Sequence, residues 1–331
     1  MKTCFSAIAL LLLLNVNAYS KTQLFESKYF SFQSSKQLNA HLFLYNKAIG
    51  CKFGKRPADS LAFYSFKEKF SELKPKEISE LNAIILYYRD SLVTKDLLFD
   101  NSMSEFSDIL SSNDKAINLK TEWQNAALIK IKAFEPYFNK LYWKAIDSTN
   151  NAWLTSNKAQ IASLETTVMP ELERIYQMKL PTPKIRVDLT CYATWAGAYS
   201  FKNSFEHIVF SSGHKSNQGD LATEVIFHEA SHFLVDKLNE KIATLAKEKK
   251  VTQELSLWHN VIFYTTGSVL EKEHAKQNKK FTPYYVQMKF EDKFPDFKKS
   301  VEACRKYWDP YISGKINFDD AVLNMVNYVI L

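Results

Sequence analysis

Apolar residues in the first half of the chain recur at the i, i+3, i+4 spacing that places side chains on one face of a helix. This spacing occurs in four segments, at residues 38–49, 61–73, 81–88 and 123–153. Pro136 falls inside the last segment and could break it into two helices. The pattern therefore predicts that residues 24–165 are mostly helical.

The pattern changes in the middle of the chain, where Pro181 and Pro183 end a helical segment. Alternating or apolar runs then predict three β-strands, at residues 185–190, 192–200 and 206–212. Helical patterns return after residue 220. We predict an α+β fold, predominantly helical, in which a small and mostly antiparallel sheet is followed by a helix. The chain divides into a helical N-terminal region at 21–165 and a second region at 166–331.

The first residues look like a signal peptide rather than part of the fold. Lys2 precedes an apolar run at 7–14, and small or neutral residues at 16–18 or 18–20 follow it. A stable membrane anchor needs about 20 apolar residues, so the run is too short, although an uncleaved anchor is the alternative. We predict a signal peptide at 1–20, export to the periplasm or the extracellular space, and no stable membrane span after its cleavage.

Composition excludes some classes of function. The chain has 331 residues, 46% of them hydrophobic, and a formal net charge of +7, which becomes +6 when Lys2 leaves with the leader. No dense Lys/Arg block appears, so we expect no nucleic-acid partner. Three cysteines remain after the leader, Cys51, Cys191 and Cys304, and none has C-x-x-C spacing. One disulfide could form among them, but we favour three structural or spectator cysteines.

The most informative segment is the string His228-Glu229-Ala230-Ser231-His232. It lies in a stretch without Gly or Pro, residues 223–236, which we predict to be one helix capped by Asp220. At 3.6 residues per turn, the two histidines lie one turn apart on the same face. Glu229 is rotated by about 100° from His228.

This spacing suits metal-assisted hydrolysis. Two neutral imidazoles one turn apart can bind one Zn²⁺ at about 2.0–2.1 Å each. Glu229 can then act on a water molecule as general base. The string is expected by chance roughly 0.01 times in a chain of this composition. Apolar neighbours such as Phe227 and Phe233 indicate a buried helix, in which unpaired histidines would be costly.

The motif resembles that of the zincin metallopeptidases, in which H-E-x-x-H lies on the active-site helix. It is closest to the thermolysin-like gluzincins and to uncharacterised exported bacterial H-E-A-S-H proteins. The resemblance covers about residues 185–275 and implies that the region 166–331 is a zincin-like catalytic region. It also implies zinc ligation by His228 and His232, and a general base at Glu229.

Two further expectations come from the same resemblance. Asp236 lies four residues after His232, where thermolysin-like enzymes have an acid that can hold a ligand imidazole. The strand at 206–212 would be the one along which an extended substrate pairs.

The third metal ligand is less defined by the sequence. Val235 and Leu238 stand where the metzincin extension needs Gly and His, so that subclass is excluded. We favour His259, because it is the one imidazole in a very apolar helical segment. The acids of the later helices are the alternatives, namely Glu254, Glu271 and Glu273.

Tyrosines near the site could stabilise a developing oxyanion by donating a hydrogen bond. We favour Tyr264 as this second catalytic residue beside Glu229; Tyr192, Tyr199 and Asn217 are the alternatives. The remaining histidines have no partner at chelating spacing and are expected to be structural, namely His41, His207, His214 and His274.

The sequence thus predicts a zinc hydrolase, most specifically a metallopeptidase with Zn²⁺ as cofactor and a peptide or protein as substrate. Two alternatives remain open at this point. One is a non-catalytic, zinc-stabilised exported binding protein on a zincin scaffold. The other is a zinc hydrolase of a non-peptide substrate.

Overall fold

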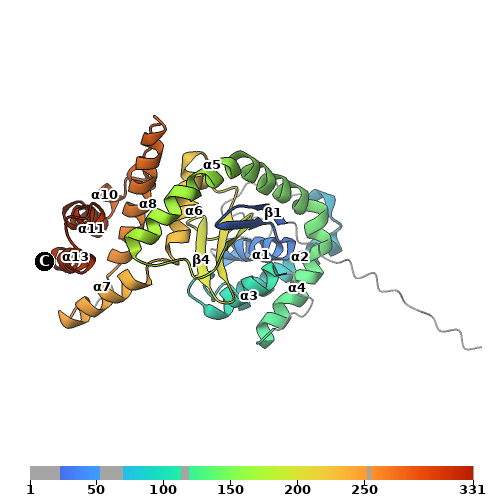
Figure 1. The fold of residues 1–331 in the computed structure, drawn as a ribbon. Helices are drawn as coiled ribbons and strands as arrows, with labels where there is room; N and C mark the ends of the chain where they lie inside the picture. The colour runs from blue at the N-terminus through green and yellow to red at the C-terminus, as the bar shows by residue number, and fades with distance from the viewer. Residues whose placement is uncertain (1–22, 53–69, 113–118, 252–254, 331) are drawn as a thin grey trace, which may run out of the picture.

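The computed structural model describes residues 23–52, 70–112, 119–251 and 255–330. The expected signal peptide and most of the segment 61–73 lie outside these ranges. Helices cover both faces of one central sheet, and the C-terminal helices gather at one side of it (Figure 1). The sheet strands are β1 (Gln23–Glu26), β2 (Phe30–Gln33), β3 (Ile185–Thr190), β4 (Ala198–Lys202) and β5 (Glu206–Ser211).

The five strands form a mixed sheet in the order β1-β2-β3-β5-β4. β2, β3 and β5 run parallel to one another, and β1 and β4 pair antiparallel at the two edges. The predominantly helical α+β class is confirmed, but the mostly antiparallel sheet is wrong. The prediction missed β1 and β2 because each has only four residues. The strand expected at 192–200 begins only at Ala198.

The edge of the sheet is also not where the resemblance placed it. β5, expected to pair with substrate, lies between β3 and β4 and has both sides occupied. Within the described residues, β4 pairs with β5 alone, so β4 is the edge strand beside the motif helix.

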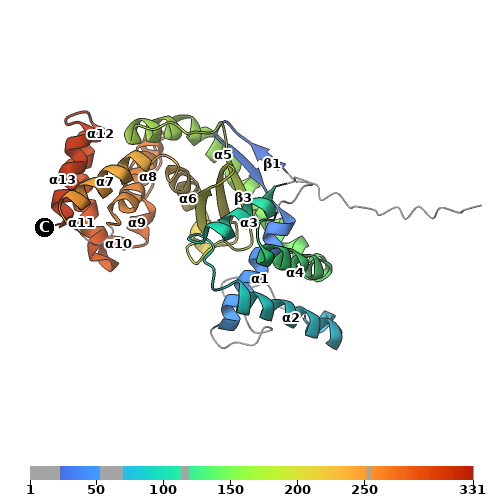
Figure 2. The ribbon, with the colours of Figure 1, turned by 90° about the horizontal axis from the view of Figure 1, so that it is seen from below.

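Helices pack on the two faces because alternate strand residues point to opposite sides. On one face, Val187, Ile208 and Phe210 join a core cluster with α5 (Lys144–Tyr176) and α6 (Asp220–Ser231). On the other face, Tyr199 and Val209 join a second cluster with the N-terminal helices. These are α1 (Lys36–Lys52), α2 (Pro75–Ser91), α3 (Asn101–Ser111) and α4 (Glu122–Phe138). Figure 2 shows α1 and α3 on the side of the sheet opposite to α6.

Two expected breaks in the first half are not breaks in the structure. Pro136 lies inside the last turn of α4, whose chain continues through a π-helical turn at 139–143 into α5. The expected boundary at residue 165 falls within α5, which contacts α6 and α8 as well as β3.

The second half is built around one long helix. α8 (Leu257–Lys276) contacts α5, α6, α7 (Asp236–Glu248), α9 (Tyr284–Gln287) and α11 (Pro295–Ala303). The other C-terminal helices are α10 (Phe290–Lys293), α12 (Asp309–Ile312) and α13 (Phe318–Ile330). In the described part of the chain, no helix has the length and apolar character needed to cross a membrane. Cys51, Cys191 and Cys304 are buried free thiols.

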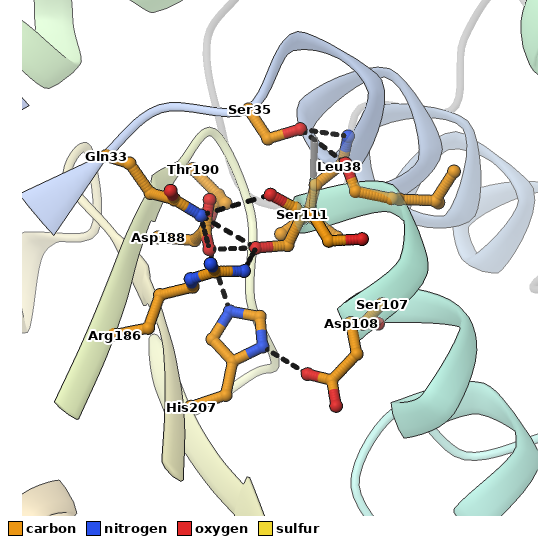
Figure 3. Close-up of polar contacts among 12 residues, drawn as sticks. Gln33, Ser35, Leu38, Ser107, Asp108, Ser111, Arg186, Asp188, Thr190 and His207 are labelled. Atoms are coloured by element: carbon orange, nitrogen blue, oxygen red, sulfur yellow. Dashed lines mark hydrogen bonds and ion pairs between the residues drawn. The ribbon is translucent and has the colours of Figure 1, made fainter. Parts of the chain in front are cut away.

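A buried charged network joins α3 to the sheet (Figure 3). The His207 ring bridges two carboxylates, with Nδ1 2.8 Å from Asp108 Oδ1 and Nε2 2.9 Å from Asp188 Oδ2. Gln33 Nε2 and Ser111 Oγ also donate to Asp188 Oδ2, at 2.7 and 2.5 Å. Burial alone would lower the pKa of His207, but the hydrogen bonds to the two carboxylates outweigh it and raise the pKa. The structure therefore gives His207 a structural role, as expected.

We expect Asp108→Asn to lower the free energy of unfolding by about 3 kcal/mol at pH 6, because it breaks a buried ion pair. Since the pKa of His207 is raised, the pairing stabilises fully below about pH 6.5 and is lost as the pH rises through the folded value. The difference in unfolding free energy between wild type and Asp108→Asn should therefore be smaller at pH 9 than at pH 6. Urea unfolding at both pH values measures it, with the exposed Asp292→Asn as control. An equal loss at both pH values would contradict this account.

Candidate metal centre

The motif helix α6 is shorter than predicted. It begins at Asp220, after Gly219 with φ of 59°, so Asp220 lies in the first turn rather than at the cap. It ends at Ser231, and a turn leads to α7 instead of one helix over 223–236. His232 is the C-cap and keeps helical dihedrals, φ −57° and ψ −27°. Its side chain therefore stays one turn from His228, as the spacing requires.

α6 and α8 pack side by side in opposite directions. At one end, the rings of His232 and His259 lie 5.2 Å apart between centroids. One turn on, His228 packs on Phe263 at 4.1 Å. A further turn on, Glu224 lies against Gly267. Each layer takes one residue from each helix at i, i+4 spacing, so the register of this packing decides which side chains meet.

The packing brings three histidines together. Centroid distances are 5.2 Å between His228 and His232, 5.3 Å between His228 and His259, and 5.2 Å between His232 and His259. One ring nitrogen from each lies within 4.8 Å of those of the other two. This is a candidate metal site of three histidines, and His259 completes it as the sequence favoured.

The environment keeps these imidazoles neutral. Burial, with the neighbouring histidines as a smaller cause, lowers the pKa of His228 well below its ordinary value and that of His232 to about 3. Burial lowers the pKa of His259 to about 4. A neutral imidazole has a free lone pair, which is the form that ligates a metal.

The donor set fits a zinc ion. Three histidine nitrogens leave room for one further ligand in a tetrahedral site, which is the arrangement of catalytic rather than structural zinc. Among the described residues, the buried Nδ1 of His228 has no hydrogen-bond partner. His228 is buried and His232 and His259 are half-buried, so an ion held by the three would be partly shielded from solvent.

Glu229 lies beside the cluster and faces the edge strand. It is 7% exposed, and its Oε2 accepts a hydrogen bond from Ser200 Oγ of β4 at 2.7 Å. Burial raises the pKa of Glu229 to about 7, although the Ser200 bond opposes this. Ser200 of the sheet thus orients the carboxyl group of Glu229. Near pH 7 both of its protonation states are populated. Ser200 was not predicted, because nothing in the local sequence ties this strand residue to α6.

Glu224 is a second buried acid on α6, one turn before His228. It is 1% exposed, and its Oε2 accepts from the backbone N–H of Tyr284 at 2.7 Å. Burial raises the pKa of Glu224 to about 8. Gly267 makes room for it, because a Cβ there would lie 3.0 Å from Glu224 Oε1 and 2.7 Å from Pro283 Cβ.

The structure does not bring the other predicted residues to the cluster. Tyr264 lies five positions after His259, about 140° round α8, and its hydroxyl donates to Asp309 Oδ2 at 2.8 Å. We therefore leave Tyr264 out of the proposed machinery. Asp236 is exposed in the first turn of α7, because α6 ends before it and the i+4 relation to His232 is lost.

The alternatives also lie elsewhere. Glu271 and Glu273 are three or more turns along α8 from His259, and Glu254 lies outside the described residues. Tyr192 and Tyr199 are buried in the second core cluster. Asn217 donates to the backbone carbonyls of Gly197 and Ser211.

Comparison of the chain with protein-family models, curated proteins and solved structures finds no match. The class defined by fold and site is therefore a helix-rich α+β protein with a candidate three-histidine metal centre beside a buried glutamate. Any more specific assignment rests on the chemistry of this centre.

We expect His259→Ala to weaken Zn²⁺ binding by more than about 100-fold, because two of three ligands remain. Titration calorimetry with ZnCl₂ measures the affinity. His274→Gln is the matched control, since His274 is on the same helix but outside the cluster. Equal affinities of wild type and His259→Ala would remove His259 from the site.

Glu224→Gln should change the pH dependence of the unfolding free energy of the metal-free protein. Because the pKa is raised, Glu224 keeps its proton in the folded protein up to about pH 8 but loses it near pH 4.5 in the unfolded chain. Wild type therefore loses stability as the pH rises between these values, whereas Gln does not titrate. We expect the variant to gain about 2–3 kcal/mol relative to wild type between pH 5.5 and 8. Urea unfolding with a chelator present measures this, with Glu240→Gln as the exposed control. A pH-independent difference would contradict it.

Proposed function

We propose that the protein is a zinc-dependent peptidase with His228, His232 and His259 as metal ligands and Glu229 as general base. The observation that carries the proposal is the convergence of three neutral imidazoles beside a buried carboxylate. The carboxylate is held by the strand at the open edge of the sheet. The expected leader at 1–20 makes export part of the same proposal.

Zinc bound by these histidines would polarise a substrate carbonyl and lower the pKa of a nearby water molecule. Glu229 accepts the proton of the attacking water and passes it to the leaving amine. Its raised pKa suits both tasks near neutral pH. Ser200 orients the carboxylate by donating to Oε2, which leaves Oε1 to face the reaction.

The edge strand β4 supports an extended peptide as substrate. The backbone N–H of Ser211 donates to the carbonyl of Gly197, so these two residues form a hydrogen-bonded pair of the antiparallel ladder. Because such pairs alternate, Tyr199 is bonded to Val209, and the backbone groups of Ala198 and Ser200 point to the open edge. A peptide pairing there would run alongside Ser200, whose hydroxyl bonds Glu229.

Aromatic side chains beside the histidines are compatible with a peptide substrate. Phe263 contacts the rings of His228 and His259, and it packs on Tyr284 and Phe290 at 6.0 and 5.4 Å. Phe263, Tyr284 and Phe290 are partly exposed. Such a wall suits the apolar side chain of a residue next to the cleaved bond.

We expect Glu229→Gln to lower kcat on a peptide substrate by about 10²–10⁴-fold, because the amide cannot take the water proton. Zinc content should stay at the wild-type level, since Glu229 is not a ligand. Fluorogenic peptide libraries measure turnover and atomic absorption measures zinc. The exposed Glu240→Gln serves as control.

Unchanged turnover in zinc-loaded Glu229→Gln would exclude Glu229 as the base. A zinc-loaded wild type that cleaves no peptide would instead support the non-catalytic binding protein. Cleavage of esters or cell-wall material in place of peptides would support the hydrolase of a non-peptide substrate.

A further inference from the structure

An exposed tryptophan lies three residues before the edge strand β4. Trp195 is 78% exposed, whereas apolar side chains of this size are usually covered. It belongs to the turn between β3 and β4, two residues before Gly197. Among the described residues, only Phe99, at 83%, is a large hydrophobic side chain with greater exposure.

The turn that carries Trp195 is held by hydrogen bonds. The N–H of Gly197 donates to Thr194 O at 3.0 Å, and the N–H of Ala196 donates to Thr194 Oγ1 at 3.2 Å. Asn217 Nδ2 and the Ser211 N–H both donate to Gly197 O, at 2.9 Å each. The indole is therefore presented by a preorganised turn, which lowers the entropic cost of binding through it.

Glycine is required at the end of this turn. Gly197 has φ of 92°, a conformation that other residues rarely adopt. A Cβ at this position would also lie 2.6 Å from His214 Nδ1. The close packing of His214 against the Gly197 backbone thus fixes the position where the turn enters β4, and with it the position of Trp195.

Trp195 precedes the strand whose Ser200 bonds the candidate catalytic base. Ser200, which bonds Glu229, is five residues after Trp195. At about 3.3 Å per residue, this separation is at most about 17 Å. Between the two, the backbone groups of Ala198 and Ser200 point to the open edge, where the Ala198 carbonyl accepts one long hydrogen bond, from Thr194 Oγ1 at 3.4 Å. The edge of β4 thus runs from Ser200 back to the turn that carries Trp195.

We propose that Trp195 binds an apolar side chain, preferably aromatic, of an extended peptide that pairs with β4. That side chain lies three to five residues from the cleaved bond. This inference rests on the proposed peptidase function and adds a specificity to it. Aromatic rings held at such sites are frequent binding hot spots, because they offer a large contact area with few rotamers to immobilise.

The first experiment compares peptides of two lengths. Short fluorogenic peptides span the cleaved bond with two residues on each side, and long ones extend either end by four residues carrying one Phe or one Ser. For wild type we expect the Phe extension at one end to raise kcat/KM by about tenfold, mainly through KM, relative to Ser. In Trp195→Ala this gain should disappear, and Trp195→Phe should restore part of it.

Phe99→Ala is the matched control, because it removes an equally exposed aromatic side chain from a different loop. It should keep the full gain from the Phe extension. The inference is overturned if Trp195→Ala keeps the full gain from the Phe extension. It is also overturned if the substitution lowers kcat/KM by the same factor for the Phe and Ser peptides.

A binding measurement separates this inference from the proposed function. Fluorescence anisotropy of labelled long peptides is recorded with zinc-loaded Glu229→Gln protein, with and without Trp195→Ala. About tenfold weaker binding of the Phe peptide after loss of the indole supports the inference, and equal binding overturns it. If wild type cleaves no peptide, the peptidase proposal fails, yet this measurement still decides whether Trp195 binds apolar peptide side chains.

Discussion

The arrangement of the candidate metal centre depends on one packing interaction, the antiparallel contact of α6 with α8. Its register pairs His232 with His259, His228 with Phe263, and Glu224 with Gly267. A shift by one turn would replace one of the histidine contacts by an aromatic one. Gly267 is what permits the close approach at the far end, where no Cβ could be accommodated without displacing Pro283 or Glu224. The small residue thus contributes to the metal site from two turns away.

Local sequence was enough to predict the features that depend on local geometry. The spacing of His228 and His232 required only a helix, and the structure provides it even though α6 ends at Ser231. His259 could be favoured because an imidazole in a very apolar helix needs a partner. Its meeting with the other two depends on a nonlocal contact, which the sequence could suggest but not define.

The features that were missed depend on pairing between distant segments. β1 and β2 were missed because four-residue strands carry little pattern, and β5 was mistaken for the edge because strand order is not written in any single strand. Ser200 gains its role only when β4 is placed beside α6. Tyr264 was favoured as a phenol near the expected zinc site that could donate to an oxyanion, but its angular position on α8 directs it to Asp309.

The position of β2 in the sheet has a consequence for the order of folding. β2 lies between β1 and β3, and its partner β3 follows about 150 residues later in the chain. At a synthesis rate of about 5–20 residues per second, β2 waits roughly 8–30 seconds before β3 exists. The sheet is therefore a late structure with high contact order, and the helices of the first half can collapse before it. The edge that would carry substrate is made by β4 and β5, which are close in sequence, so only the addition of β1 and β2 requires the two halves of the chain to meet.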